Sequence, residues 1–414
     1  MASVRTVDGH ELRHVLTPAS FDEAAETLRG ADDAGTVVVP WGGGSMMGLG
    51  NLPESPALAL DLTGLNQVVS YEPDDLTIAV QAGCRMADLT SLLAKNGQML
   101  PFDAADPAQA TIGGLFATGV SGPSRFGYGA MRDLVIGITT VSPRGEISRG
   151  GGMVVKNVSG YDMMRLHYGA IGSLGVILRL NFKVIPAPRA TRTVVLQFDN
   201  ARSAMDAAMR VRESPLTPSS IVAIDEAWST AACLDPACMS LLLRADGPEG
   251  AVRRQAERLL ELAGVASAGS TMLDDDESAR VWNDVNRCLS AVTDSATINV
   301  RIGIQPSAAM DVLDCVNSIG EESSLERAIT ADLGNGQMFV RLTNRGVGAD
   351  TLPTAWNALS GLGQHATLLS APADVKRNTD VFGSEPAGFA VMQSLKEQFD
   401  PSRTLNRGRF IGRL

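Results

Sequence analysis

A glycine-rich loop near the N-terminus carries the first residue types that could do chemistry. The loop directly follows a short apolar run and consists of Trp41, Gly42, Gly43, Gly44, Ser45 and Met46. Adjacent glycines adopt φ values that other residues resist, so their N–H groups can point into one concavity and bind phosphate oxygens. A flexible turn is the alternative for this loop taken alone. The chain has neither GxGxxG nor GxxxxGKS/T, which excludes the usual Rossmann and P-loop phosphate sites.

A second loop combines glycines with small hydroxylated residues. Its candidate cofactor-binding residues are Pro107, Thr111, Ile112, Gly113, Gly114, Ala117, Thr118, Ser121 and Gly122. Small residues let a large planar ligand lie against the backbone, while Thr and Ser hydroxyls reach its polar edge. Glycine-rich packing between sheets is the alternative. A third segment adds KNVSGYD, from Lys156 to Asp162, and GSLGVI, from Gly172 to Ile177.

In this order and spacing, the three segments resemble the FAD-binding domain of the vanillyl-alcohol-oxidase and p-cresol-methylhydroxylase (PCMH) flavoproteins, over about residues 15–190. The resemblance implies that residues 42–46 bind the pyrophosphate of FAD. It implies that residues 111–122 follow the pyrophosphate, ribityl chain and isoalloxazine, and that Gly175 and Ile177 approach the adenine. Some members tether the flavin through His or Cys. Because the first loop contains neither, we expect FAD to be bound non-covalently.

Within that group, the KNVSGYD and SLGVI runs resemble the branch that contains D-lactate and glycolate dehydrogenases. Catalytic chains of this branch carry a histidine-rich metal cluster in a cap domain. This chain has only His365 in that region, so we expect no metal site. The segment GQHATLL and the ending FDPSRTLNRGR resemble the smaller FAD-binding chains of bacterial glycolate oxidases, the GlcE-like family, which also lacks the cluster. In this ending Asn406 is a candidate to face the flavin, with a simple C-terminal cap as the alternative.

Two hypotheses for the function follow from the resemblance. In the first, the chain is the FAD-binding subunit of a glycolate oxidase complex, and its partners are a larger catalytic flavoprotein (GlcD-like) and an iron–sulfur protein (GlcF-like). In the second, it is a self-contained FAD-dependent oxidoreductase that oxidises a small 2-hydroxy acid such as D-lactate, passing hydride to the flavin. A flavin-free scaffold is a third possibility, which the three intact loops disfavour.

Arg301 is the candidate catalytic residue of the second hypothesis, in which a guanidinium of the cap domain holds the substrate carboxylate. It lies among alternating apolar residues on a predicted strand, and an ordinary surface strand residue is the alternative. Lys156, Tyr161 and Arg165 are further candidates to approach the flavin face, or only to hold it in place. His167 is expected to be a packed helix histidine.

The elements around these loops predict an α+β fold. Residues 1–187 are expected to form a two-subdomain PCMH-type FAD-binding domain, whose first helix starts at a capping box of Ser20 and Glu23. Residues 188–385 show the order β-α-β-β-α twice, which predicts a ferredoxin-like cap domain with helices on one face. Residues 386–414 are expected to form a C-terminal segment that docks on the FAD-binding domain.

Composition limits the partners. The net charge is −11 with only five lysines, so no basic stripe exists for nucleic acid. The N-terminus is polar, and no run of about 18 apolar residues is present, so no direct membrane insertion is expected. We expect a cytoplasmic protein, which its partners could bring to the inner face of the cell membrane. The five cysteines form no CxxC pair and are expected to be free thiols.

Overall fold

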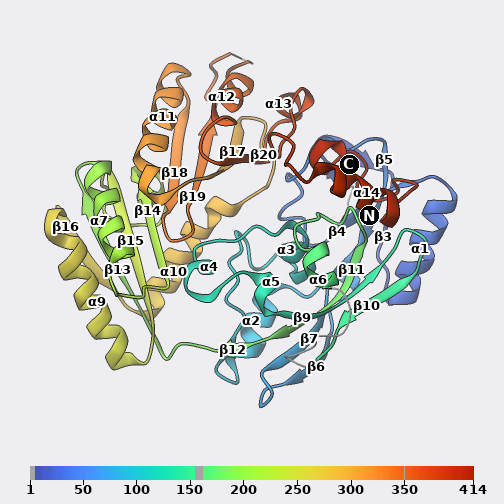
Figure 1. Cartoon of the computed structure of the whole chain (residues 1–414), viewed down its shortest axis with the longest axis horizontal. Coiled ribbons are helices and arrows are strands. Elements are labelled where there is room, and N and C mark those ends of the chain that lie inside the picture. The colour runs from blue at the N-terminus through green and yellow to red at the C-terminus, as the bar shows by residue number, and fades with distance from the viewer. Residues whose placement is uncertain (1–4, 154–161, 349) are drawn as a thin grey trace.

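A computed structural model describes residues 5–153, 162–348 and 350–414 (Figure 1). Strands of the N-terminal half form two separate sheets, and the strands from residue 190 onward form one sheet of eight strands. This arrangement confirms the predicted α+β class, with two subdomains followed by an antiparallel cap. No helix in the described ranges is both long enough and apolar enough to span a bilayer.

The first N-terminal sheet is a small parallel one. Its strand order is β3 (His14–Leu16), β5 (Pro56–Asp61) and β4 (Val37–Trp41), and helix α1 (Phe21–Asp33) makes the crossover that parallel strands require. The helix begins as predicted, because the Ser20 hydroxyl accepts a hydrogen bond from the Glu23 N–H at 3.1 Å. The Glu23 carboxylate reaches back to the Ala19 N–H instead of that of Ser20. Strand β4 is mostly buried, and it therefore fixes the position at which the glycine loop begins.

The second N-terminal sheet is antiparallel, with the order β10-β9-β11-β7-β6. Its strands are β6 (Val68–Glu72), β7 (Thr77–Gln81), β9 (Val135–Val141), β10 (Ile147–Gly151) and β11 (Val176–Lys183). Two short pairs accompany it: β1 (Arg5–Val7) with β2 (His10–Leu12), and β8 (Gln98–Met99) with β12 (Ile185–Pro186). The short helices of this half are α2 (Met86–Ala94), α3 (Ile112–Thr118), α4 (Arg125–Tyr128), α5 (Met131–Leu134) and α6 (Met163–His167). The glycine-rich segments connect these elements between the two sheets.

The eight-stranded sheet consists of two ferredoxin-like halves. Its order is β16-β13-β15-β14-β18-β19-β17-β20, and all neighbouring strands are antiparallel. The first half contains β13 (Ala190–Phe198), β14 (Ser220–Asp225), β15 (Met239–Gly247) and β16 (Gly269–Leu273). The second contains β17 (Thr297–Gly303), β18 (Glu326–Asp332), β19 (Gln337–Thr343) and β20 (His365–Ser370). Each half thus completes the predicted β-α-β-β-α order with a fourth strand, which lies at an outer edge of the sheet.

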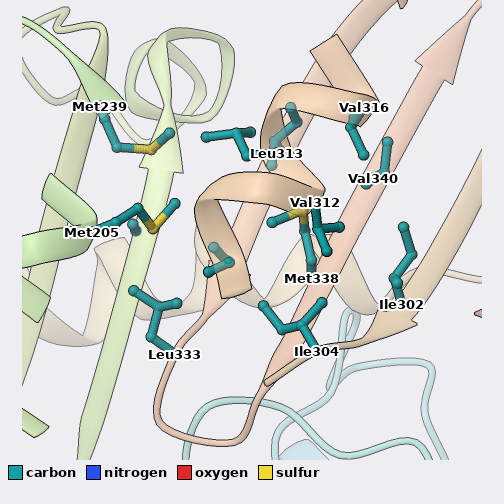
Figure 2. Packing of buried hydrophobic residues seen from close by; sticks show 14 of the residues in the cluster. Met205, Met239, Ile302, Ile304, Val312, Leu313, Val316, Leu333, Met338 and Val340 are labelled. Carbon is teal, nitrogen blue, oxygen red and sulfur yellow. The ribbon is translucent and has the colours of Figure 1, made fainter. Parts of the chain in front are cut away.

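One face of this sheet is covered by helices α7 (Ala201–Glu213), α9 (Glu249–Ala263), α11 (Ala309–Glu322) and α12 (Thr351–Leu359). Figure 2 shows their shared core, in which Met205 of the first half lies near Leu313 of the second. Val300 and Ile302 of β17 belong to this core. Because side chains alternate along a strand, Arg301 points to the opposite face, toward the N-terminal half. Helices α8 (Glu226–Ala231) and α10 (Asp275–Val285), which were not predicted, lie in the second half of the chain outside the ferredoxin-like pattern.

The C-terminal segment leaves the eight-stranded sheet and returns to the N-terminal half, as predicted. After α13 (Ala373–Arg377) comes α14 (Phe389–Phe399), which lies near strands β3 to β5 in Figure 1. Leu405 then pairs with Val38 of β4 in a parallel bridge. The Val38 N–H donates to the Thr404 carbonyl at 2.8 Å, and the Asn406 N–H donates to the Val38 carbonyl at 2.9 Å. The tail therefore forms part of the wall around the glycine loop.

Candidate active site at the glycine loops

The two glycine loops contact each other through their backbones. A Cβ placed on Gly43 would overlap the carbonyl oxygen of Gln109, and a Cβ on Gly42 would overlap the Thr111 hydroxyl. Gly44 has φ of +83°, a conformation that favours glycine. These glycines are therefore required by the packing, and the surface that they present is bare backbone.

Thr111 starts helix α3, which was not predicted because glycines dominate the segment. Its hydroxyl accepts a hydrogen bond from the Gly114 N–H at 3.3 Å, as an N-cap residue does. Gly113 packs on Ala82, where an added Cβ would lie 2.6 Å from the Ala82 Cβ. The helix ends at Gly119, whose φ is +63°. The hydroxyl of Thr118 bonds back to the Gly114 carbonyl at 3.0 Å, so helix geometry fixes this side chain.

A cleft with an empty volume of about 780 Å³ runs between the loops. Most of the predicted cofactor-binding residues line it: Trp41, Gly42, Gly43, Gly44, Ser45, Met46, Thr111, Gly113, Gly114, Ala117, Thr118, Ile177 and Asn406. The lining also contains Val176, which lies between Gly175 and Ile177 in the segment expected to approach the adenine. Residues that were not predicted line it too: Pro40, Met47, Leu49, Leu62, Ala82, Ile171, Gly172 and Arg409. The cleft is mostly apolar, with bare backbone at one end, and this composition suits a dinucleotide that has a flat ring system and a pyrophosphate. No His or Cys is among the described residues that line the cleft.

The other predicted cofactor-binding residues lie beside the cleft. Ile112 is fully buried in the core, because the first turn of α3 points its side chain inward. Ser121 and Gly122 line a separate small cavity around Asp103, and the Ser121 hydroxyl lies 3.2 Å from the Tyr168 hydroxyl. Pro107 accepts a hydrogen bond from α2 with its carbonyl, and Gly175 packs against His167. A cofactor role for these residues remains a prediction.

Asn406 crosses from the C-terminal tail into the cleft. It has φ of +46°, and its side-chain amide donates to the Ile171 carbonyl at 2.5 Å. Helix α14 ends at Phe399, so Asn406 is not part of a helix cap, which was the alternative. Its Oδ1 atom is buried and has no hydrogen-bond partner in the described part of the chain. That oxygen is available to accept a hydrogen bond from a ligand in the cleft.

The third segment is only partly described. Lys156 and Tyr161, two candidates to approach the flavin face, lie outside the described residues. Arg165 pairs with Asp162 at 2.9 Å and its side chain is 64% exposed, so it contributes to the surface. His167 is buried on α6 and packs edge-on against Phe399, as a structural histidine does.

A second cavity lies next to the cleft and shares Leu49 and Thr118 with it. Its empty volume is about 1610 Å³, including space open to solvent. The walls come from three parts of the molecule: Gly119, Val120 and Tyr168 from the N-terminal half; Arg301, His365, Thr367 and Phe382 from residues 188–385; Met392 and Phe410 from the C-terminal segment. A ring bound at the shared wall would therefore face a chamber lined by polar side chains of the cap.

Arg301 is the cation of this chamber. Its side chain is half-buried, and its Nη2 atom lies 3.4 Å from the Thr367 hydroxyl. No ion pair in the described ranges includes it, and its side chain lines the chamber. Burial lowers the pKa of Arg301, partly offset by Tyr168, yet an arginine keeps its charge. The chamber thus presents an unpaired positive charge to any carboxylate that enters.

His365 lies beside Arg301 on strand β20. Its Nε2 atom is 3.1 Å from the Thr367 hydroxyl, so Thr367 joins the imidazole and the guanidinium. Burial and the charge of Arg301 lower the pKa of His365, so the ring is neutral near pH 7. The described residues contain no group of three or more His, Cys, Asp and Glu placed to hold a metal ion.

Comparisons with known proteins agree with this geometry. Residues 12–151 match the family described as FAD binding domain, and residues 187–331 match that of FAD linked oxidases, C-terminal domain. The two matched segments are therefore an FAD-binding domain and a C-terminal domain of the FAD linked oxidases; the chain is an oxidoreductase and its cofactor is FAD.

Two sequence relatives and one solved structure are similar to this chain. Glycolate oxidase subunit GlcD of Bacillus subtilis (strain 168) is 24% identical over 417 residues, which cover 96% of this chain and 89% of the relative. Glycolate oxidase subunit GlcE of Escherichia coli (strain K12) is 33% identical over 201 residues, which cover 48% of this chain and 53% of the relative. The solved structure of p-cresol methylhydroxylase with substrate bound superposes with a TM-score of 0.73 at 14% identity, covering 95% of this chain and 88% of that one, and so shares the fold.

Proposed function

We propose that this protein takes part in the oxidation of a small 2-hydroxy acid, with glycolate as the first candidate. The unpaired Arg301, held in a chamber that shares a wall with the FAD cleft, carries the proposal. A 2-hydroxy acid has a carboxylate for Arg301 and a hydroxyl-bearing carbon to be oxidised. The names of the relatives support this substrate class, because both are glycolate oxidase subunits.

Different residues of the chain would bind the cofactor, bind the substrate and accept a proton. FAD supplies the hydride acceptor when it is bound. Backbone of residues 42–46 and the amide of Asn406 hold the cofactor, while Arg301 fixes the substrate carboxylate and thereby its orientation. His365, neutral and linked to Arg301 through Thr367, is the group placed to accept the proton of the substrate hydroxyl at Nε2. Phe382 and Phe410 pack on each other and exclude water from one side of the chamber.

We propose that the chain does this as the FAD-binding subunit of a glycolate oxidase-type complex, together with a larger flavoprotein and an iron–sulfur protein. The lack of a histidine cluster in the sequence supports the subunit role, since only four histidines are present. Association with a membrane would then come through those partners. The alternative is a self-contained D-lactate-like dehydrogenase, and the match to a GlcD chain over nearly the whole length supports it equally.

Purification of the chain alone separates the two roles. Its visible flavin bands should be recorded before and after anaerobic addition of glycolate or D-lactate. Bleaching of the bands is the result expected of a self-contained enzyme. Unbleached bands, together with co-purification of a second flavoprotein and an iron–sulfur protein, are the result expected of a member of a complex.

Replacement of Arg301 tests the substrate site in either role. Oxalate, a carboxylate analogue that is not oxidised, should perturb the flavin spectrum on binding. We expect Arg301→Gln to weaken oxalate binding by about 10- to 100-fold, because a charge-assisted pair is lost, and Arg301→Lys to weaken it less. Arg192→Gln is the matched control, since Arg192 of β13 pairs with Asp275 of α10 and neither residue lines the chamber. Equal oxalate affinity in Arg301→Gln and the control would contradict the assignment.

A further inference from the structure

A group of buried charged side chains contacts residues 47–49, which directly follow the first glycine loop. The Lys376 ammonium donates to Asp8 Oδ1 at 2.7 Å and to the Gly48 carbonyl at 2.7 Å, and both of these charged side chains are fully buried. Arg409, which is 3% exposed, donates from Nη2 to the carbonyls of Met47 at 2.7 Å and Leu49 at 2.6 Å. Two cations, Lys376 of α13 and Arg409 of the C-terminal segment, therefore hold the chain that immediately follows the glycine loop.

The charges in this group do not balance. Asp8 is the acidic group that acts on Arg409, and it is already paired with Lys376. Burial lowers the pKa of Lys376, the pairing with Asp8 opposes this shift, and the neighbouring charge of Arg409 adds to it. A buried charge is costly unless an opposite charge compensates it. One positive charge at this place lacks a counter-ion within the described chain.

Arg409 also has a hydrogen-bond donor that no described residue uses. Its Nε atom is buried and has no hydrogen-bond partner among the described residues. Arg409 lines the FAD cleft together with Gly42–Met46, the loop expected to bind the pyrophosphate. The hydrogen bonds to the carbonyls of Met47 and Leu49 account for the position of the Arg409 Nη2 atom. They account neither for the unpartnered Nε donor nor for the uncompensated positive charge. An anion bound in the cleft would accept a hydrogen bond from this donor and would compensate this charge.

We propose that Arg409 is a phosphate-binding residue of the FAD site and supplies the counter-charge to the pyrophosphate. The planar guanidinium suits phosphate oxygens, and the glycine loop adds N–H donors from the other side. Because Arg409 also holds residues 47–49, FAD and the C-terminal tail stabilise each other. The inference rests on the binding of FAD, not on the identity of the substrate.

Three variants test this assignment in the apoprotein: Arg409→Gln, Arg409→Lys, and Arg407→Gln as a matched control. Arg407 lies in the same tail, and its side chain bonds to the carbonyls of Arg403 and Ser402. Titration with FAD and with riboflavin, which has the flavin ring but no phosphate, is followed by flavin fluorescence. We expect Arg409→Gln to weaken FAD binding by about 10- to 100-fold and leave riboflavin binding unchanged. Arg409→Lys should recover part of the loss, and Arg407→Gln should bind FAD as the parent does.

Two results would overturn the proposal. One is unchanged FAD affinity in Arg409→Gln. The other is an equal loss for FAD and riboflavin, which would place the guanidinium at the ring or in the fold alone. If Arg409→Gln does not fold, the parent apoprotein decides: ADP and inorganic pyrophosphate are expected to raise its melting temperature, and no shift with either would refute the proposal. Failure of the oxalate experiment at Arg301 would leave each of these outcomes unaffected.

Discussion

Single glycines in the first loop decide whether the cleft exists. We expect Gly43→Ala to lose bound FAD and to lower the free energy of unfolding by about 1–3 kcal/mol, because the new methyl group would overlap the backbone carbonyl of Gln109. Flavin absorbance per mole of protein and urea unfolding measure the two effects. Gly30→Ala is the control: nothing lies within 4 Å of its added Cβ in α1, and a gain of about 0.5–1 kcal/mol is expected. Full flavin content in Gly43→Ala would refute this account of the loop.

At the residue scale, the sequence predicts backbone sites better than side-chain sites. Adjacent glycines after a strand are a local pattern, so Gly42 to Gly44 could be assigned without the fold. Arg409 could not, because the tail also contains Arg403, Arg407 and Arg413, and only burial separates one arginine from the others. Asn406 was found through its resemblance to a family ending. Its unpartnered oxygen depends on contacts with residues far away in the sequence.

Among the elements, helix α14 and the tail after it depend on one buried ion pair. Lys396 donates to Asp400 at 2.6 Å, to the Ser173 carbonyl at 2.9 Å and to the Leu405 carbonyl at 3.0 Å. We expect Lys396→Met to cost about 3–5 kcal/mol of unfolding free energy, because Asp400 would remain buried without its partner. The tail should become sensitive to protease, and FAD affinity should fall. Glu397→Gln, at an exposed position on the same helix, should change none of these.

Elements with a strong repeat in the sequence were predicted, and isolated ones were missed. The two β-α-β-β-α patterns gave the helices and central strands of the cap sheet. Strand β16 was missed because it is a short edge strand with mostly exposed side chains and no apolar alternation. Helix α10 has a capping box of Asp274 and Glu277, a signal that was present in the sequence. Pairing between β14 and β18, which joins the two halves, follows from the fold and has no local signal.

For the whole molecule, His167 gives stability a defined pH dependence. Burial lowers the pKa of His167 from 6.5 to about 4. Between these values the unfolded chain binds a proton that the folded chain does not, so stability is full above pH 6.5 and falls as the pH is lowered. Relative to His167→Gln, the parent should lose about 2 kcal/mol of unfolding free energy between pH 7 and pH 5. Urea unfolding at several pH values measures this difference, and a constant difference would contradict it.

The relative placement of the parts was the least predictable property of the whole molecule. The sequence predicted a tail that docks and a cap that carries Arg301. It did not predict that the sheet face with Arg301 would form one chamber with Tyr168 of the N-terminal half. That arrangement arises because Leu49 and Ile171 pack in the same apolar cluster as Phe339 and Leu369 of the sheet. Contacts of this kind join residues too far apart in sequence for any periodic pattern.

The return of the tail to strand β4 also sets an order of events during protein synthesis. Met47 and Arg409 are in direct contact although they are 362 positions apart in the chain. At 5–20 residues per second, a ribosome needs roughly 20–70 s to pass from one to the other. During that interval the newly made glycine loop lacks Asn406 and Arg409, and the apolar surface of β4 lacks Leu405. If Asn406 and Arg409 hold FAD as proposed, tight binding of the cofactor begins only after translation has reached the tail.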